Sequence, residues 1–122
     1  MRGGPFTSWD DAPAVQVSPG DVVRVITGLG VQVIRSVVQP GVEFEVHGHP
    51  EEQMIVVLDG QLRFRVGDIE TVARAGDVVH VPPGVPHGGG VVGDRPLVAI
   101  EVFQPPRPEI GHGSTRARIV DS

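Results

Sequence analysis

The sequence predicts an all-β protein whose strands form an antiparallel sandwich or barrel. Short runs rich in valine and isoleucine recur along the 122-residue chain, and their spacing is typical of this fold class. Glycine (17 residues) and proline (12 residues) interrupt these runs every few positions. No window carries the 3.6-residue apolar stripe of an amphipathic helix, so we expect almost no helix.

Each predicted strand is a β-branched run that ends at turn-forming residues. Asp59-Gly60 separates two of these runs and predicts a two-residue β-hairpin, since glycine supplies the positive φ of a type I′ turn. Gly67 and Gly76 mark the next two reversals. The predicted strands, in chain order, are Asp21–Thr27, Val31–Gln39, Val42–His47, Met54–Leu58, Gln61–Val66, Ile69–Ala73, Asp77–Val81 and Leu97–Phe103.

The chain is expected to form a single domain over residues 1–122, because a chain of this length has no room for a second core. We place the barrel core at about 15–104, an N-terminal arm at 1–14 and a C-terminal tail at 105–122. Several strands are apolar at both parities, as in Val78-Val79, and are therefore expected to be buried on both faces. This pattern predicts a homodimer.

Composition excludes several partners. A net charge of −5 and a pI near 5.4 argue against nucleic acid, which attracts concentrated positive charge. The chain has no apolar run of about 18 residues, so we expect no membrane span. The segment from Met1 to Pro5 lacks the apolar core of a secretory signal, and we expect a cytoplasmic protein. The absence of cysteine rules out disulfides and thiolate ligands.

The histidines predict a metal site. His47 and His49 are two apart on a predicted strand, so both imidazoles should project from one face. Gln53 has the same parity and could supply an amide oxygen as a third ligand; Glu51, in the bend, ranks second. His87 follows a proline-rich segment that turns the chain back. An antiparallel fold can therefore bring it beside the first two histidines.

These residues resemble a known family, the cupins. Their glycines, prolines, histidines and glutamine fall at the offsets of the first cupin motif (Gly41, His47, His49, Gln53, Gly60) and of the second (Gly76, Pro82, Pro83, Gly84, His87). The resemblance covers about Val15 to Arg107 and implies a double-stranded β-helix, or jelly-roll barrel. It also implies one divalent ion held by His47, His49, Gln53 and His87, a ligand set that suits Zn, Mn, Fe, Ni or Co. Gln53 replaces the usual glutamate, which leaves the site one unit more positive.

Two stretches resemble the small monocupins of the pectin-degradation type more closely. They are His49–Met54 and Glu101–Arg107, the second of which has glutamate where that family has aspartate. The resemblance implies conversion of unsaturated uronic acids to open-chain keto sugars, with a small-molecule substrate as partner.

Four residues are candidates for catalysis. Glu101 and Phe103 share parity, so both should face the interior if either does. Glu101 would then be a proton shuttle and Phe103 would pack against the substrate's apolar face. Arg107 would grip a substrate carboxylate through two parallel hydrogen bonds. His80 is a candidate base in the pocket. The alternatives are a structural Glu101–Arg107 ion pair, Phe103 as simple core, and His80 in an inter-strand hydrogen bond or a subunit contact.

Several functions fit this set of residues. We expect a metal-dependent isomerase or tautomerase that acts on a small carbonyl compound or sugar acid. An Fe(II)-type dioxygenase acting on a small organic substrate is the second hypothesis, since three histidines and one oxygen ligand leave open positions on the metal. A cyclase-like biosynthetic cupin and a non-catalytic binding module are the remaining alternatives.

Overall fold

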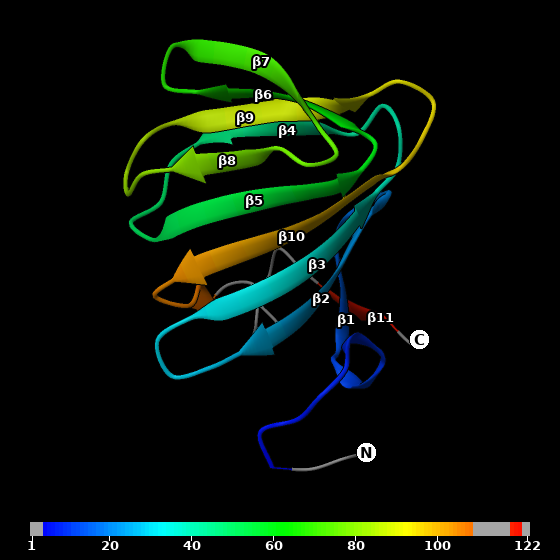
Figure 1. Cartoon of the computed structure of the whole chain (residues 1–122), viewed down its shortest axis with the longest axis vertical. Helices are drawn as coiled ribbons and strands as arrows, with labels where there is room; N and C mark the ends of the chain where they lie inside the picture. The colour runs from blue at the N-terminus through cyan, green and yellow to red at the C-terminus, as the bar shows by residue number, and fades with distance from the viewer. Residues whose placement is uncertain (1–3, 109–117, 121–122) are drawn as a thin grey trace.

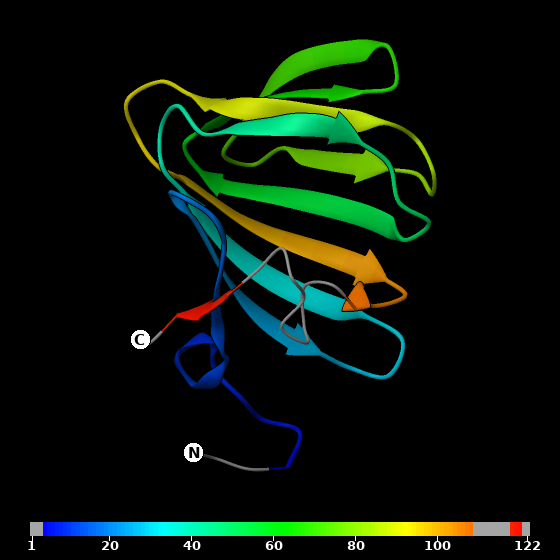
Figure 2. The ribbon, with the colours of Figure 1, turned by 180° about the vertical axis from the view of Figure 1, so that it is seen from behind.

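The structure, a computed structural model, describes residues 4–108 and 118–120 and confirms the all-β prediction (Figures 1 and 2). A 3-10 helix at Trp9–Asp11 precedes the strands. The strands are β1 (Ala14–Ser18), β2 (Asp21–Thr27), β3 (Gln32–Val38), β4 (Glu43–His47), β5 (Glu52–Asp59), β6 (Gln61–Val66), β7 (Ile69–Arg74), β8 (Val78–Val81), β9 (His87–Val92), β10 (Leu97–Gln104) and β11 (Arg118–Val120).

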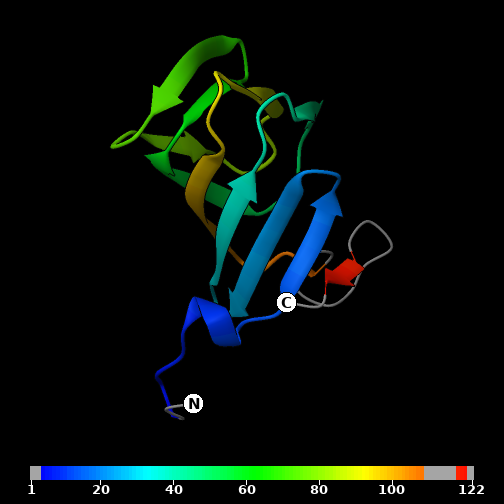
Figure 3. The ribbon, with the colours of Figure 1, turned by 90° about the vertical axis from the view of Figure 1, so that its right-hand side faces the viewer.

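The strands form two antiparallel sheets. The longer sheet has the order β11-β1-β2-β3-β10-β5-β8, and the shorter one has the order β4-β9-β6-β7. The shorter sheet lies on the β8 side of the longer one, and β1 and β2 extend away from it (Figures 1 and 3). Because neighbours such as β3 and β10 are far apart in sequence, the site is assembled by long-range pairing.

Every predicted strand is present, with ends that differ by at most a few residues. The sequence missed β1, β9 and β11. The segment that forms β9 contains three consecutive glycines, which strands normally disfavour. It is nevertheless central in the shorter sheet, paired with β4 on one side and with β6 on the other.

The predicted hairpin at Asp59-Gly60 is wrong. β5 pairs with β8 and β10, whereas β6 pairs with β7 and β9, so the turn is a corner between the two sheets. Gly60 has φ +80°, as the turn rule requires. A Cβ there would also lie 2.5 Å from the Pro96 carbonyl oxygen, so the link before β10 passes too closely for any side chain. The hairpin at Gly67, between β6 and β7, is confirmed.

Alternate residues of each strand fill the space between the sheets. The larger cluster of buried side chains comes from both sheets and includes Ile55, Val57 and Leu62. A second cluster is formed by side chains of β1, β2, β3 and β10, among them Val23, Ile34 and Phe103. The helices of the described segments include none long and apolar enough to cross a lipid bilayer.

The chain ends make specific contacts. The Arg24 guanidinium donates hydrogen bonds to the carbonyl oxygens of Trp9 (3.3 Å) and Ala12 (3.0 Å), which attaches the N-terminal segment to β2. In the predicted tail, β11 adds an edge strand to β1. Residues 109–117 and 121–122 of that tail lie outside the described residues.

Candidate metal centre and adjoining cavity

Three histidines converge where β4 and β9 meet. His47 is the last residue of β4 and lies opposite His87, the first residue of β9. His49 follows in the loop after β4, rather than on the strand as the sequence predicted. The ring centroids lie 4.5 Å (His47–His87), 4.7 Å (His49–His87) and 5.6 Å (His47–His49) apart. One nitrogen from each ring lies within 4.8 Å of the others, so the three histidines can form a metal site.

Backbone hydrogen bonds orient all three rings in the same way. Each Nδ1 lies 2.9 Å from a carbonyl oxygen two residues away: Glu45 for His47, Glu51 for His49 and Val85 for His87. A carbonyl oxygen only accepts, so each Nδ1 carries the proton and each Nε2 keeps its lone pair. This is the tautomer that a metal-binding histidine adopts when its other nitrogen is held by the protein.

The contact between His49 and Gln53 brings two hydrogen-bond acceptors together, and a cation bound to both would stabilise it. The Gln53 amide nitrogen donates to Glu101 Oε1 (2.7 Å), which fixes the amide orientation. Gln53 Oε1 therefore points toward His49 Nε2 at 3.1 Å, and both atoms are acceptors. Burial, followed by the positive charge of Arg107, lowers the pKa of His49, so a proton on Nε2 is disfavoured. A metal ion that both atoms coordinate would satisfy them.

The environment of His87 also favours a neutral ring. Its side chain is buried, and this burial is the main cause of its lowered pKa. The charges of His47 and His49 act in the same direction. Neutral imidazoles are the form that binds metal ions, so the ring nitrogens and the Gln53 oxygen fit a divalent cation.

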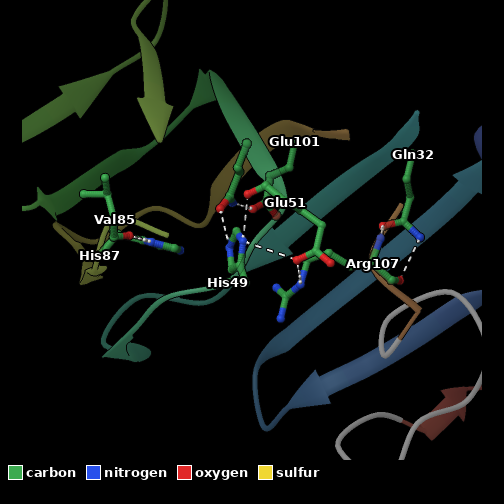
Figure 4. A network of polar contacts seen from close by, with 8 residues as sticks. Gln32, His49, Glu51, Val85, His87, Glu101 and Arg107 are labelled. Carbon is green, nitrogen blue, oxygen red and sulfur yellow. Dashed lines mark hydrogen bonds and ion pairs between the residues drawn. The ribbon is translucent and has the colours of Figure 1, made fainter. Parts of the chain in front are cut away.

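Glu51 lies behind His49 rather than beside the converging nitrogens. Its Oε1 is 3.5 Å from His49 Nδ1 and 3.8 Å from Arg107 Nε, and it is buried without a hydrogen-bond partner (Figure 4). Its carboxylate thus approaches the Nδ1 side of the His49 ring, away from the lone pair on Nε2. The Arg107 guanidinium in turn lies 5.4 Å from the centre of the Phe103 ring.

A cavity of about 130 Å³ lies between the two sheets and is lined in part by His47 and His87. Glu101, Phe103 and Arg107 all line it, and the shared parity of the first two is as predicted. Glu101 accepts one hydrogen bond on each oxygen, from Gln53 Nε2 (2.7 Å) and from Ser36 Oγ (2.6 Å). The carboxylate is therefore fixed beside Gln53, one of the candidate metal ligands.

The sequence did not identify Asp21 or Ser36 as site residues. Both line the cavity, and Asp21 is only 7% exposed. Burial and the nearby negative charge of Glu101 raise the pKa of Asp21 to about 7. In the sequence, Asp21 follows a Pro-Gly turn, where aspartate is a common surface residue, so local sequence gives no indication of this role.

His80 lies outside the cavity. It is on β8, half exposed, and its Nε2 is 2.7 Å from a carboxylate oxygen of Glu52 on β5. This is the inter-strand hydrogen bond that was the alternative to a pocket role. Arg63 likewise pairs with Glu43 and Glu70 on the outer surface.

The fold and the convergent histidines define a class of protein, a small β-barrel in which three of the described histidines form a candidate metal centre. Residues 34–103 match the family model of the cupin domain, and the chain belongs to this family. The jelly-roll prediction is thereby confirmed.

Among curated proteins, the chain is 35% identical over 72 residues to the H2HPP isomerase of Bacillus subtilis, across 58% of this chain and 30% of that protein. It is also 35% identical over 74 residues to the acireductone dioxygenase of Geobacillus thermodenitrificans, across 56% of this chain and 41% of that protein. The chain thus spans less than half the length of these relatives. KdgF from Halomonas sp. has a similar structure, with a TM-score of 0.79, 20% identity, and coverage of 88% of this chain and 99% of that one.

Proposed function

We propose that this protein is a metal-dependent isomerase or tautomerase that acts on a small carbonyl compound or sugar acid of the unsaturated-uronate type. The observation that supports this proposal is the position of Glu101, fixed by Gln53 and Ser36 on a cavity wall next to the candidate metal ligands. A carboxylate in that place can move a proton between neighbouring atoms of a bound substrate. The relative named as an isomerase agrees with this choice.

The proposed ligands for one divalent ion are His47, His49, Gln53 and His87. A divalent ion held there would supply Lewis-acid polarisation of a substrate oxygen. Gln53 has two roles in this arrangement, because its oxygen faces His49 and its nitrogen holds Glu101. The position of the Glu101 carboxylate is therefore tied to the metal centre.

Arg107 and Phe103 are proposed to bind the substrate. Arg107 follows β10 and lines the cavity, where a guanidinium can hold a carboxylate through two parallel hydrogen bonds. The peptide groups of Arg107 are fixed by Gln32, with Arg107 N to Gln32 Oε1 at 3.2 Å and Gln32 Nε2 to Arg107 O at 3.3 Å. Phe103 forms an apolar wall beneath the guanidinium.

Activity on an unsaturated uronate tests the proposal. A Glu101→Gln variant should keep its metal and lose at least about 100-fold in kcat, since general acid–base catalysis contributes 10² to 10⁴. An Arg107→Met variant should mainly raise KM, and the exposed His80→Gln variant should match the wild type. The measurement is loss of the alkene absorbance in the ultraviolet. An active Glu101→Gln variant would contradict the proton-transfer role.

A dioxygenase is the second candidate, because a curated relative carries that name and the proposed ligand set suits a redox metal. Elemental analysis of untagged protein purified without chelator separates the two. Zinc, manganese or nickel near one equivalent favours the isomerase. Iron, together with substrate-dependent oxygen consumption, favours the dioxygenase.

We also propose a homodimer formed through the outer face of the longer sheet. Strand register places valines side by side there, with Val22 beside Val37 and Val37 beside Val98. Met54 and Val78, on β5 and β8, are 44% and 58% exposed on the same face. Val22 is also exposed, whereas Val37 and Val98 are half-buried. Apolar side chains gathered on one outer face support an interface there.

A Met54→Arg, Val78→Arg double variant should convert the dimer to a monomer, because two charges would lie in the apolar contact. Light scattering after size-exclusion chromatography measures the mass. Ile69→Arg is the matched control, since Ile69 is 73% exposed on β7 of the other sheet. A wild type that is monomeric at about 100 μM would rule out the dimer.

A further inference from the structure

Asp21 is a buried carboxyl group of the cavity wall that the proposed reaction does not use. It begins β2, and its side chain lines the same cavity as Glu101 and Arg107. Only 7% of the residue is exposed. Burial of a carboxyl group is costly unless the group is paired or neutral.

Strand register places Asp21 toward the end of the cavity opposite the metal centre. Phe103 on β10 lies opposite Gln53, and therefore marks the level of the proposed ligands. Asp21 on β2 pairs with Val38 on β3, and Val38 pairs with Leu97 on β10. Leu97 comes six residues before Phe103 on β10. Every second residue of a strand faces the cavity, so six residues along β10 correspond to three rows of cavity-facing side chains. Three such rows therefore separate Asp21 from the level of the proposed metal ligands. Glu101 lies in a row between them.

The two carboxyl groups of the cavity have different surroundings. Glu101 accepts hydrogen bonds from Ser36 and Gln53 on its two oxygens. Asp21 has an aliphatic neighbour across the strand, Val38, and none of the described residues donates a hydrogen bond to its carboxyl group. Burial and the charge of Glu101 raise the pKa of Asp21 to about 7. The acid is therefore neutral and carries a proton at mildly acidic pH.

We propose that Asp21, as a neutral carboxylic acid, donates a hydrogen bond to an uncharged oxygen at the far end of a bound substrate. The cavity would thus select small carboxylates whose far end carries a carbonyl or hydroxyl group. This inference rests on the proposed binding of a carboxylate by Arg107. A second carboxylate at the far end would be disfavoured, because the Glu101 carboxylate faces the same cavity and like charges repel.

Two acids of the same shape test this assignment, 6-oxoheptanoate and 6-methylheptanoate, which differ in whether the far end carries a carbonyl oxygen. We compare their dissociation constants by calorimetry for wild type, Asp21→Asn and Asp21→Val. At pH 6 the ratio of the two dissociation constants should favour the keto acid roughly fivefold to tenfold more in the wild type than in Asp21→Val. This difference corresponds to about one hydrogen bond.

The pH dependence identifies the donor. An acid with a raised pKa donates below that pKa and loses its proton above it, so the wild-type preference should vanish between pH 6 and pH 8.5. Other titratable groups face the cavity from other elements, namely His47 on β4, His87 on β9, Glu101 on β10 and Arg107 after β10. Asp21→Asn retains all of them and keeps an N–H donor, so its preference should persist at both pH values.

The outcomes separate this inference from the proposed function. A wild type that binds both acids but shows the same ratio as Asp21→Val overturns the role of Asp21 alone. A preference in the wild type that persists at pH 8.5 also overturns it, since the donor would then be another group. If neither acid binds to the wild type, the role of Arg107 in binding carboxylate fails as well.

Discussion

A His47→Ala variant is expected to lose its metal while it remains folded. His47 is exposed, so its removal leaves no cavity in the core. Its ring supplies one of the three nitrogens that lie within 4.8 Å of each other. Loss of this ligand should reduce the affinity for metal by at least about 100-fold, since loss of a residue that only supports a ligand already costs 10-fold to about 100-fold. Elemental analysis and thermal melting with and without metal are the measurements.

His80→Ala is the matched control for this variant. Both histidines are exposed residues on strands, but His80 pairs with Glu52 on the outer surface. The control should therefore keep one equivalent of metal. A His47→Ala protein that still holds one equivalent would refute the proposed centre. Alanine at the buried His87 should also abolish binding, although its burial means that stability has to be measured separately.

A Gly89→Ala variant is expected to be destabilised by more than about 3 kcal/mol, beyond ordinary overpacking. Gly89 lies on β9 between Phe44 of β4 and Phe64 of β6. A Cβ at this position would overlap the Arg63 carbonyl oxygen and would lie 2.9 Å from Phe64 Cα. These are backbone atoms of the neighbouring strand, so no change of rotamer can relieve the overlap.

Urea unfolding with Gly30→Ala as control measures this effect. Gly30 has open space around its Cβ position and no positive φ, so its replacement should change the free energy of unfolding by less than about 0.5 kcal/mol. Equal stability of the two variants would mean that β9 does not lie as closely between β4 and β6 as described. Because β9 begins at His87, we also expect Gly89→Ala to weaken metal binding.

Much of the candidate site was predictable because its residues are close in sequence or have a characteristic spacing. His47, His49 and Gln53 lie within one short segment, and His87 follows the proline-rich segment at a spacing that resembles the second cupin motif. The parity rule correctly placed Glu101 and Phe103 on one face of the strand, and the structure shows that this face lines the cavity. The same rule did not establish whether His80 faces the cavity, and the structure places it on the outer surface with Glu52.

Strand-forming tendency and parity are short-range properties, so the sequence by itself determined most of the strands, which side chains of a strand share a face, and the cluster of histidines. Which strands become neighbours depends on how two sheets bury their apolar faces together, and only the tertiary structure decided this. It made Asp59-Gly60 a corner rather than a hairpin, and it placed Gly89 between two backbones. It also buried Asp21 in the cavity with Glu101, although 80 positions separate them, so their electrostatic coupling has no local counterpart in the sequence.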